Sequence, residues 1–112
     1  MKVQLDLTVR LQKKEKEIRD YYAQQMAAVA SPYGREERET WFSQVQEADA
    51  WIADNSLTPP LVTSLASSRG ISIAELVSKI KENDELFRVA IGDLLGRQQA
   101  ELDQLRQPIK QP

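Results

Sequence analysis

The last third of the chain restricts the fold more than any other part of the sequence. Over 73–107 apolar residues recur at intervals of three and four, which is the spacing of one face of an α-helix. The preceding segment 72–75, Ser-Ile-Ala-Glu, matches a capping box, whose side chains satisfy free backbone N–H groups at a helix start. Pro108 cannot continue a helix. The pattern predicts one helix over 73–107, with a break or bend at 83–84, where Asn-Asp interrupts the apolar stripe.

The first thirty residues carry a weaker helical pattern. Ile18, Tyr22 and Met26 lie about one turn apart, so we expect helix through most of 3–30. Over 2–10 apolar and polar residues alternate strictly, which is also the period of a β-strand. The sequence offers no second strand to pair with it. A short N-terminal strand is therefore the alternative, and it implies pairing with another copy or another protein.

A turn and a second helix are expected next. Ser-Pro-Tyr-Gly at 31–34 is typical of a turn, and the glutamates that follow favour the positive end of a helix dipole. We expect a helix over 35–53 with Trp51 beside its apolar face. The residues that share this face are Trp41, Val45, Ala48 and Ile52.

A short third helix is expected over about 60–68. Thr58 is the predicted N-cap and Pro59 the predicted first helical residue, a position that proline tolerates well. Gly70 is expected in the left-handed conformation that ends many helices, with Ile71 as its hydrophobic partner.

Together these segments predict an all-α fold in one domain over 1–112, consistent with the length. The architecture is a helical hairpin or bundle of about four helices, the last of them long. It consists of an N-terminal helix at 1–30, a helical region over 35–107 and a frayed tail at 107–112. The expected core residues are Trp41, Ile52, Leu65, Leu76, Ile80, Phe87, Ile91 and Leu95.

Composition excludes several kinds of chemistry. The chain has no Cys and no His, which excludes disulfides, thiolate or imidazole metal ligands and a Ser-His catalytic pair. With 15 basic and 17 acidic residues, it lacks the basic surplus of a general nucleic-acid-binding protein. The mixed charges over 10–20 are typical of an exposed, salt-bridged helix face. No stretch resembles an export signal or a membrane-spanning helix, so we expect a cytoplasmic protein.

The segment around Gly70 has the spacing of a helix-turn-helix motif, whose second helix enters the major groove of DNA. In such a motif the groove-facing residues would be Ser72, Ile73, Ala74, Val77 and Ser78. None is Arg, Lys, Asn or Gln, the side chains that commonly read base edges. An ordinary helical corner is the favoured interpretation, and a DNA-binding regulator is the alternative.

Carboxylates are the candidate acid–base groups. The closest sets in sequence are Glu36, Glu37 and Glu39, and Asp84 with Glu85. Without Cys, His or a Gly-rich phosphate loop, the sequence offers no nucleophile–base set. We therefore expect no enzymatic activity, no cofactor and no metal site.

Two patterns near the C-terminus indicate helix pairing. Gly92 and Gly96 lie one turn apart, and each glycine in a helix costs about 1 kcal/mol relative to alanine. This spacing favours a close approach by another backbone, within the chain or in another subunit. Five residues in this region follow one another at intervals of four, three, four and three, which suits packing on the first helix or on another copy of the chain. The residues with that spacing are Ile91, Leu95, Gln98, Leu102 and Leu105. Pairing within the chain is favoured for both patterns.

Residues 37–99 resemble a known family. The resemblance is carried by Glu37-x-x-Thr40-Trp41-x-x-x-Val45-Gln46-x-Ala48, Ala50-Trp-Ile-Ala-Asp54, Thr58-Pro-Pro-Leu61, Leu65-Ala-x-x-Arg69-Gly70-Ile71, Glu75-Leu-Val-x-Lys79-Ile80 and Gly92-x-Leu-Leu-Gly96-Arg-Gln-Gln99. This series is similar to a small helical domain, of unknown function, in tail-fibre-associated proteins of tailed bacteriophages and prophages. The resemblance implies a tail structural or fibre-assembly role, as an adaptor or chaperone, and it supplies no catalytic residues.

The functional prediction is a phage or prophage tail structural or fibre-assembly protein that acts through protein–protein contacts. A small prophage-encoded helix-turn-helix regulator is the alternative. The expected partner is a tail or fibre protein, with self-association left open and no nucleic acid or membrane. The expected locations are the host cytoplasm during assembly and then the virion tail. The residues expected at partner contacts are Val3, Leu5, Leu7, Val9, Gln98, Leu102 and Leu105.

Overall fold

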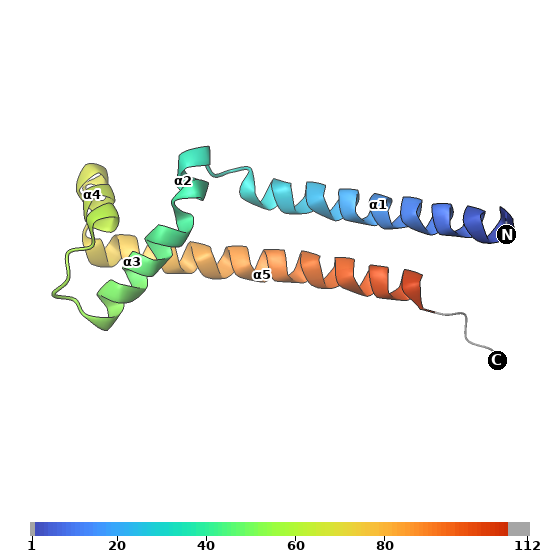
Figure 1. Ribbon diagram of the computed structural model, residues 1–112. Helices are drawn as coiled ribbons and strands as arrows, with labels where there is room; N and C mark the ends of the chain where they lie inside the picture. Colours follow the sequence, from blue (N-terminus) through green and yellow to red (C-terminus); the bar gives the residue numbers. More distant parts are fainter. Residues whose placement is uncertain (1, 108–112) are drawn as a thin grey trace. The chain divides into compact units, whose positions relative to one another are not determined.

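The computed structural model describes residues 2–107, with side chains from Asp6 onward. The described part forms five helices (Figure 1): α1 (Lys2–Ala30), α2 (Arg35–Glu39), α3 (Trp41–Ala53), α4 (Pro60–Arg69) and α5 (Ile73–Arg106). It contains no strand, so the all-α prediction is confirmed. The alternative of a strand at 2–10 is wrong, because those residues belong to α1. The tail after Gln107, Pro108 included, lies outside the described residues.

The chain divides into two compact units, and α5 contributes to both. The hairpin unit consists of α1 and the part of α5 after Val89, and the central unit consists of residues 30–89. That the chain folds as a single domain stays a prediction.

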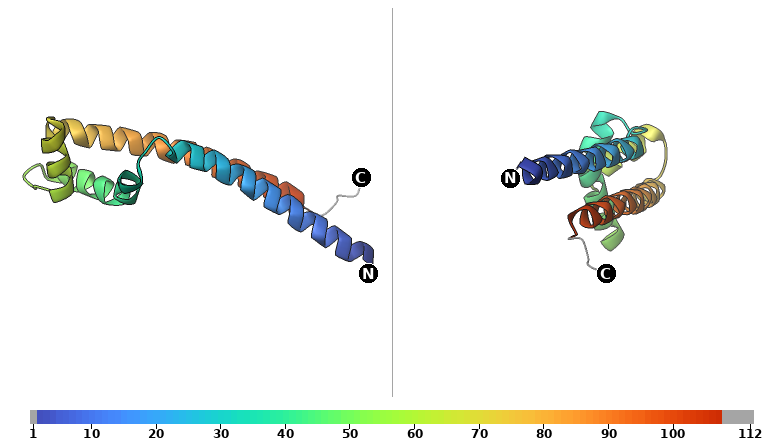
Figure 2. Two further views of the ribbon diagram at one scale, coloured as in Figure 1. Left: turned by 90° about the horizontal axis from the view of Figure 1, so that it is seen from above. Right: turned by 90° about the vertical axis from the view of Figure 1, so that its right-hand side faces the viewer.

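In the hairpin unit, α1 and the second half of α5 lie side by side and antiparallel (Figures 1 and 2). Tyr22 on α1 and Leu102 on α5 are buried. Near the end of α5, Nε of Arg106 donates a hydrogen bond to Oε1 of Glu15 at 3.0 Å. The last helix therefore packs on the chain's own first helix, as favoured.

Two expectations for this helix pair are wrong. Leu95, an expected core residue, is exposed, whereas its neighbour Leu94 is half-buried. Adjacent helix residues point in different directions, and the one partner helix covers the side of Leu94. No other backbone of the described chain lies close to Gly92 or Gly96, since a Cβ atom added at either would meet nothing within 4 Å. The solvent side of α5 carries both glycines.

In the central unit, α3, α4 and the first half of α5 enclose a small core. Its buried residues are Val45, Ala48, Val62, Ala66, Leu76, Val77 and Ile80. The predictions for Leu76 and Ile80 are thus confirmed. Among the other expected core residues, Trp41, Leu65, Phe87 and Ile91 are half-buried. Ile52 is exposed, because Trp51 completes the apolar face of α3 in its place.

The single helix predicted over 35–53 is interrupted at Thr40. This residue separates α2 from α3 with φ −95° and ψ 0°. Its hydroxyl donates to the carbonyl oxygen of Glu36 at 2.8 Å and lies 3.3 Å from that of Glu37. A threonine hydroxyl that bonds backbone carbonyls competes with the regular helix ladder, which explains a break that apolar spacing cannot predict.

Helix α4 begins at Pro60, in line with the predicted range of 60–68, but its cap lies one residue later than predicted. Pro59 is the N-cap and Pro60 the first helical residue, so the expected cap by Thr58 is wrong. The free N–H of Val62 in the first turn instead donates to Oε1 of Glu47 on α3, at 3.0 Å. A side chain from a neighbouring helix thus replaces the local cap.

The turn between α4 and α5 follows the prediction closely. Gly70 has φ +69°, and the N–H of Ile71 donates to the carbonyl oxygen of Ala66 at 3.1 Å. These features are those of a Schellman motif. Ser72 then caps α5, because its Oγ accepts a hydrogen bond from the backbone N–H of Glu75 at 3.0 Å.

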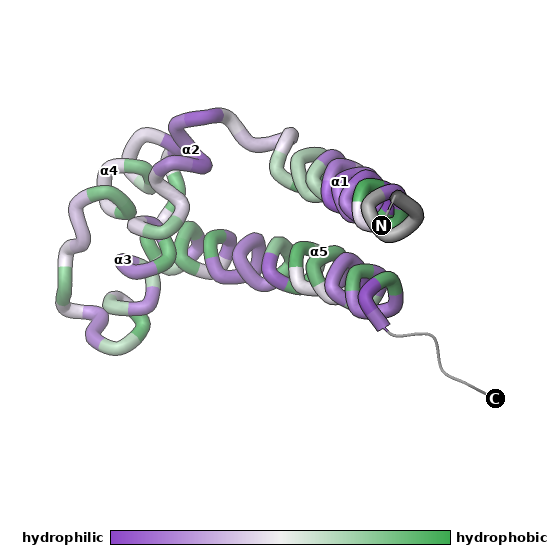
Figure 3. Tube along the Cα trace, turned by 45° about the vertical axis from the view of Figure 1, so that its right-hand side comes forward, coloured by the Kyte–Doolittle hydropathy of each residue, from purple (hydrophilic) through white to green (hydrophobic). Residues whose placement is uncertain are grey.

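Helix α5 continues through 83–84, so the predicted break there is wrong. Apolar positions recur along the helix, separated by hydrophilic ones (Figure 3). Asp84 occupies a position in the apolar stripe but has two polar partners, described below, and the helix therefore needs no interruption. None of the described helices is both long and apolar enough to span a membrane.

Candidate binding site: two hollows beside Trp41

Trp41, the first residue of α3, lines two surface hollows of the central unit. One, here called the charged hollow, has a volume of about 660 Å³. The other, here called the aromatic hollow, has a volume of about 430 Å³. The indole of Trp41 therefore forms a wall common to both.

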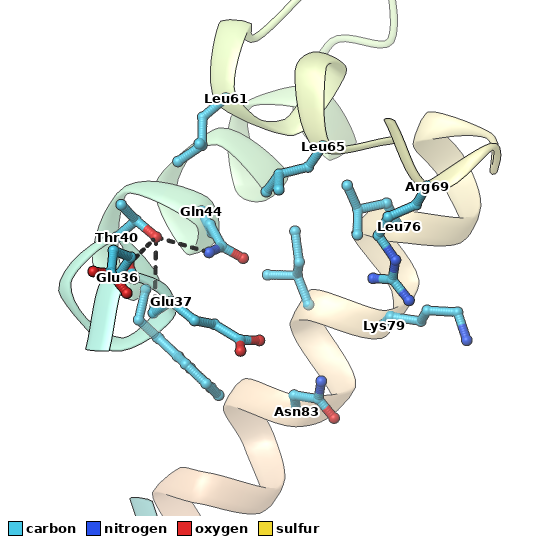
Figure 4. Close-up of a pocket in the computed structure, with 12 residues that line it drawn as sticks. Glu36, Glu37, Thr40, Gln44, Leu61, Leu65, Arg69, Leu76, Lys79 and Asn83 are labelled. Carbon is cyan, nitrogen blue, oxygen red and sulfur yellow. Dashed lines mark hydrogen bonds between the residues drawn. The ribbon is translucent and has the colours of Figure 1, made fainter. Parts of the chain in front are cut away.

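The charged hollow has acidic and basic groups on opposite walls (Figure 4). Glu36 and Glu37 belong to α2, while Arg69 on α4 and Lys79 on α5 line the opposite side of the hollow, with the Lys79 side chain pointing away from the acidic pair. None of these four charges forms an ion pair with another described residue. The apolar residues between the two walls are Trp41, Leu61, Leu65, Leu76 and Ile80.

The break at Thr40 shapes the acidic wall. The amide nitrogen Nε2 of Gln44 donates to Oγ1 of Thr40 at 3.0 Å, and Thr40 in turn bonds the last turn of α2. The side chain of Gln44 is thereby fixed inside the hollow (Figure 4). Its amide is a polar group that can bond a ligand in an otherwise apolar floor.

Aromatic rings form the second hollow. The rings of Tyr33 and Trp41 meet edge to face with centroids 4.9 Å apart, and those of Trp41 and Phe87 are tilted at 5.4 Å. Phe42 lies at the rim with 71% of its surface exposed. The side chain of Arg38 also lines this hollow and forms no ion pair with a described residue.

Asp84 is the buried charge of the site, with 7% of its surface exposed. Its Oδ1 accepts a hydrogen bond from Nε1 of Trp41 at 3.2 Å, and its Oδ2 lies 3.2 Å from Nε of Arg88. Both oxygens are therefore occupied, which is how a buried carboxylate avoids a large desolvation penalty. Asp84 thereby links the indole of Trp41 on α3 to α5.

The remaining carboxylates do not assemble into a catalytic set. Glu39 is paired with Arg35 at 2.9 Å, and Glu85 is exposed on α5. Within residues 6–107 no group of three acidic residues is arranged to hold a metal ion. The absence of enzymatic activity and of a cofactor stays a prediction.

The helix-turn-helix interpretation loses one of its base-reading positions. Val77 is buried in the core and Ile73 packs against it, so Val77 cannot reach a DNA groove. The other three positions, at Ser72, Ala74 and Ser78, are exposed.

The residues predicted to contact partners fall into three groups. Leu7 and Val9 are exposed on α1, while the side chains of Val3 and Leu5 lie outside the described residues. Gln98 and Leu105 are half-buried in the hairpin unit. Leu102 is buried in the hairpin unit formed with α1, and its role as a partner contact stays a prediction.

The mixed charges over 10–20 were interpreted as an exposed, salt-bridged helix face, and one such salt bridge is present. Nζ of Lys16 lies 2.6 Å from a carboxylate oxygen of Asp20, one turn further along. Both hollows, in contrast, have no signal in the sequence, since each is formed by segments that meet only in the folded chain.

A scan against protein-family models and searches of the curated proteins and the solved structures gave no match. The resemblance to phage tail proteins therefore stays an interpretation of the sequence.

Proposed function

We propose that the protein binds another polypeptide, as a structural or fibre-assembly component of a phage or prophage tail. The charged hollow carries this proposal. An apolar floor between an acidic and a basic wall complements an amphipathic helix that has charges of both signs beside its apolar face. The likeness of residues 37–99 to a tail-associated domain supports the tail as the setting.

The free charges of the hollow favour a polypeptide as its ligand. Glu37 and Lys79 form no ion pair with another described residue, so a ligand that pairs with both does not compete with such ion pairs. Because the two walls carry opposite charges, they also fix the orientation of a bound helix that has acidic side chains on one side and basic side chains on the other. The aromatic hollow on the other side of Trp41 offers a place for an apolar anchor.

Site-specific crosslinking in the native cells tests the proposal. A photo-reactive residue replaces Asn83, which lines the charged hollow, and in a control it replaces Ser43, which is exposed and lines neither hollow. We expect the Asn83 variant, and not the control, to crosslink to a tail or fibre protein.

Charge variants make this experiment specific. Lys79→Glu should weaken the crosslink strongly because it reverses one of the two charges of the basic wall, whereas Lys79→Arg should retain it. A crosslink of unchanged yield in Lys79→Glu would place the partner elsewhere. Binding to random duplex DNA with a steep salt dependence would instead favour the regulator.

A further inference from the structure

Helix α1 extends past the end of its partner in the hairpin unit. The ion pair between Glu15 and Arg106 marks the last described turn of α5, and the turns of α1 before Glu15 run on beyond it (Figure 1). In this extension Leu7 and Leu11 lie one turn apart with 52% and 43% of their surfaces exposed. The described residues leave about half of this apolar surface exposed, so it is available for a further contact.

Basic residues accompany this apolar pair. Arg10 and Lys14 follow Leu7 at intervals of three and seven, which places them on the same helix face. Neither forms an ion pair with a described residue. We call Leu7, Arg10, Leu11 and Lys14 the basic face.

Helix α5 carries a face of the opposite charge. Leu86 and Val89 have 64% and 67% of their surfaces exposed, three residues apart on the side of α5 that faces away from the core. Glu82 and Glu85 lie on the same side and form no ion pair with described residues. We call Glu82, Glu85, Leu86 and Val89 the acidic face.

The two faces have the same residue spacing, with intervals of three, one and three. We propose that the basic face of one copy docks antiparallel on the acidic face of a second copy. In this register Leu7 lies opposite Val89 and Lys14 opposite Glu82. Between these two pairs, Arg10 and Leu11 lie beside Leu86 and Glu85. Each apolar pair is then covered, and each free charge has a partner of opposite sign.

Each copy supplies a basic and an acidic face. A single contact leaves one free face of each kind, so further copies can add head to tail, or the two free faces can pair and close a two-fold dimer. The contact covers about two helical turns on each side, less than a standard stable interface. We therefore expect reversible association that rises with protein concentration and weakens with salt.

Charge reversal of each face tests the proposal. One variant is Arg10→Glu with Lys14→Glu, and the other is Glu82→Lys with Glu85→Lys. By sedimentation velocity, the mass of the unmodified protein should rise with concentration at about 50 mM salt and fall at about 500 mM. Each variant alone should remain monomeric, with helix content unchanged by circular dichroism.

Mixing the variants makes the test sharper. In an equimolar mixture the two intact faces complement each other, and so do the two reversed faces, so the mixture should associate although each variant alone does not. A chain with all four reversals should regain association. The matched control is Lys13→Glu with Arg19→Glu, which changes the net charge equally but lies off the basic face, and it should still associate.

Three results would overturn the proposal. A protein that stays monomeric at every concentration lacks the contact, and variants that associate like the unmodified protein assign it to other residues. A monomer whose basic face binds vesicles containing phosphatidylserine, with loss on Arg10→Glu and Lys14→Glu, would assign that face to an anionic membrane surface.

Discussion

The indole Nε1 of Trp41 donates a hydrogen bond to Oδ1 of Asp84 over 3.2 Å, across 43 positions of sequence. The bond joins α3 to α5 at the wall between the two hollows. A buried polar group that loses its partner keeps the cost of its desolvation, so both residues contribute to stability as a pair.

Trp41→Phe should lower the free energy of unfolding by about 1–3 kcal/mol, because it keeps an aromatic ring but leaves Oδ1 of Asp84 without its donor. Trp41→Ala should cost more, about 3–5 kcal/mol, since it also opens a cavity. Urea unfolding followed by circular dichroism measures both. In a double-mutant cycle with Asp84→Ala, which removes the acceptor, the effects should be non-additive. Additive effects would mean that the bond contributes nothing to stability.

Substitution of the glycines should have opposite effects at different positions. Gly70→Ala should destabilise the protein by about 1 kcal/mol or more, because φ is +69° and a Cβ atom is strained there. Gly92→Ala and Gly96→Ala should each stabilise by about 0.5–1 kcal/mol, since both lie within α5 and face open space. Thermal melts compare the three. Destabilisation by Gly92→Ala would reveal a neighbour on that side of α5 in solution.

Glu47→Ala should lower stability by about 1 kcal/mol, because it removes the side chain that accepts the N–H of Val62 at the start of α4. Glu47→Gln retains an acceptor oxygen and should cost less. Hydrogen exchange at the amide of Val62 reports the bond directly, and its protection should fall in the alanine variant. Unchanged protection there would show that water replaces the cap without loss.

The hairpin unit should lose stability in acid. The hydrogen bond from Arg106, followed by its charge, lowers the pKa of Glu15 below the ordinary range. A carboxyl group whose pKa is lower in the folded state stabilises the fold above its unfolded pKa, and this contribution disappears as the pH falls through the folded pKa. Helix content by circular dichroism from neutral pH to about pH 3 follows the loss. Glu15→Gln should remove this part of the pH dependence, and an unchanged profile would contradict the assignment.

Short-range patterns were sufficient to predict most helix ends. Gly70, Ile71 and Ser72 carry their own turn and cap geometry, because each bond they make lies within five residues of sequence. The apolar spacing likewise predicted the helices α1 and α5, because the backbone hydrogen bonds of a helix join residues close in sequence. Residues 2–10 alternate between apolar and polar side chains as a strand does, but this alternation does not supply the second strand with which a β-strand must pair.

The errors concern residues whose surroundings come from distant parts of the chain. Asp84 appeared to interrupt α5, but its partner Trp41 lies on another helix and removes the cost of burying it. Ile52 and Trp51 are adjacent, and only the position of α4 and α5 decides which one faces the core. The two hollows were unpredictable for the same reason, since no single segment forms either of them.

The Glu47 cap on α4 also bears on the order in which the structure forms. This contact closes a loop of 15 positions, whereas the Glu15–Arg106 pair closes one of 91. For a flexible chain, the longer closure costs about 1.6 kcal/mol more in entropy. Contacts between α3 and α4 thus have the kinetic advantage during folding. We therefore expect Glu15 and Arg106 to pair late, after the intervening residues have become compact and the effective loop has shortened.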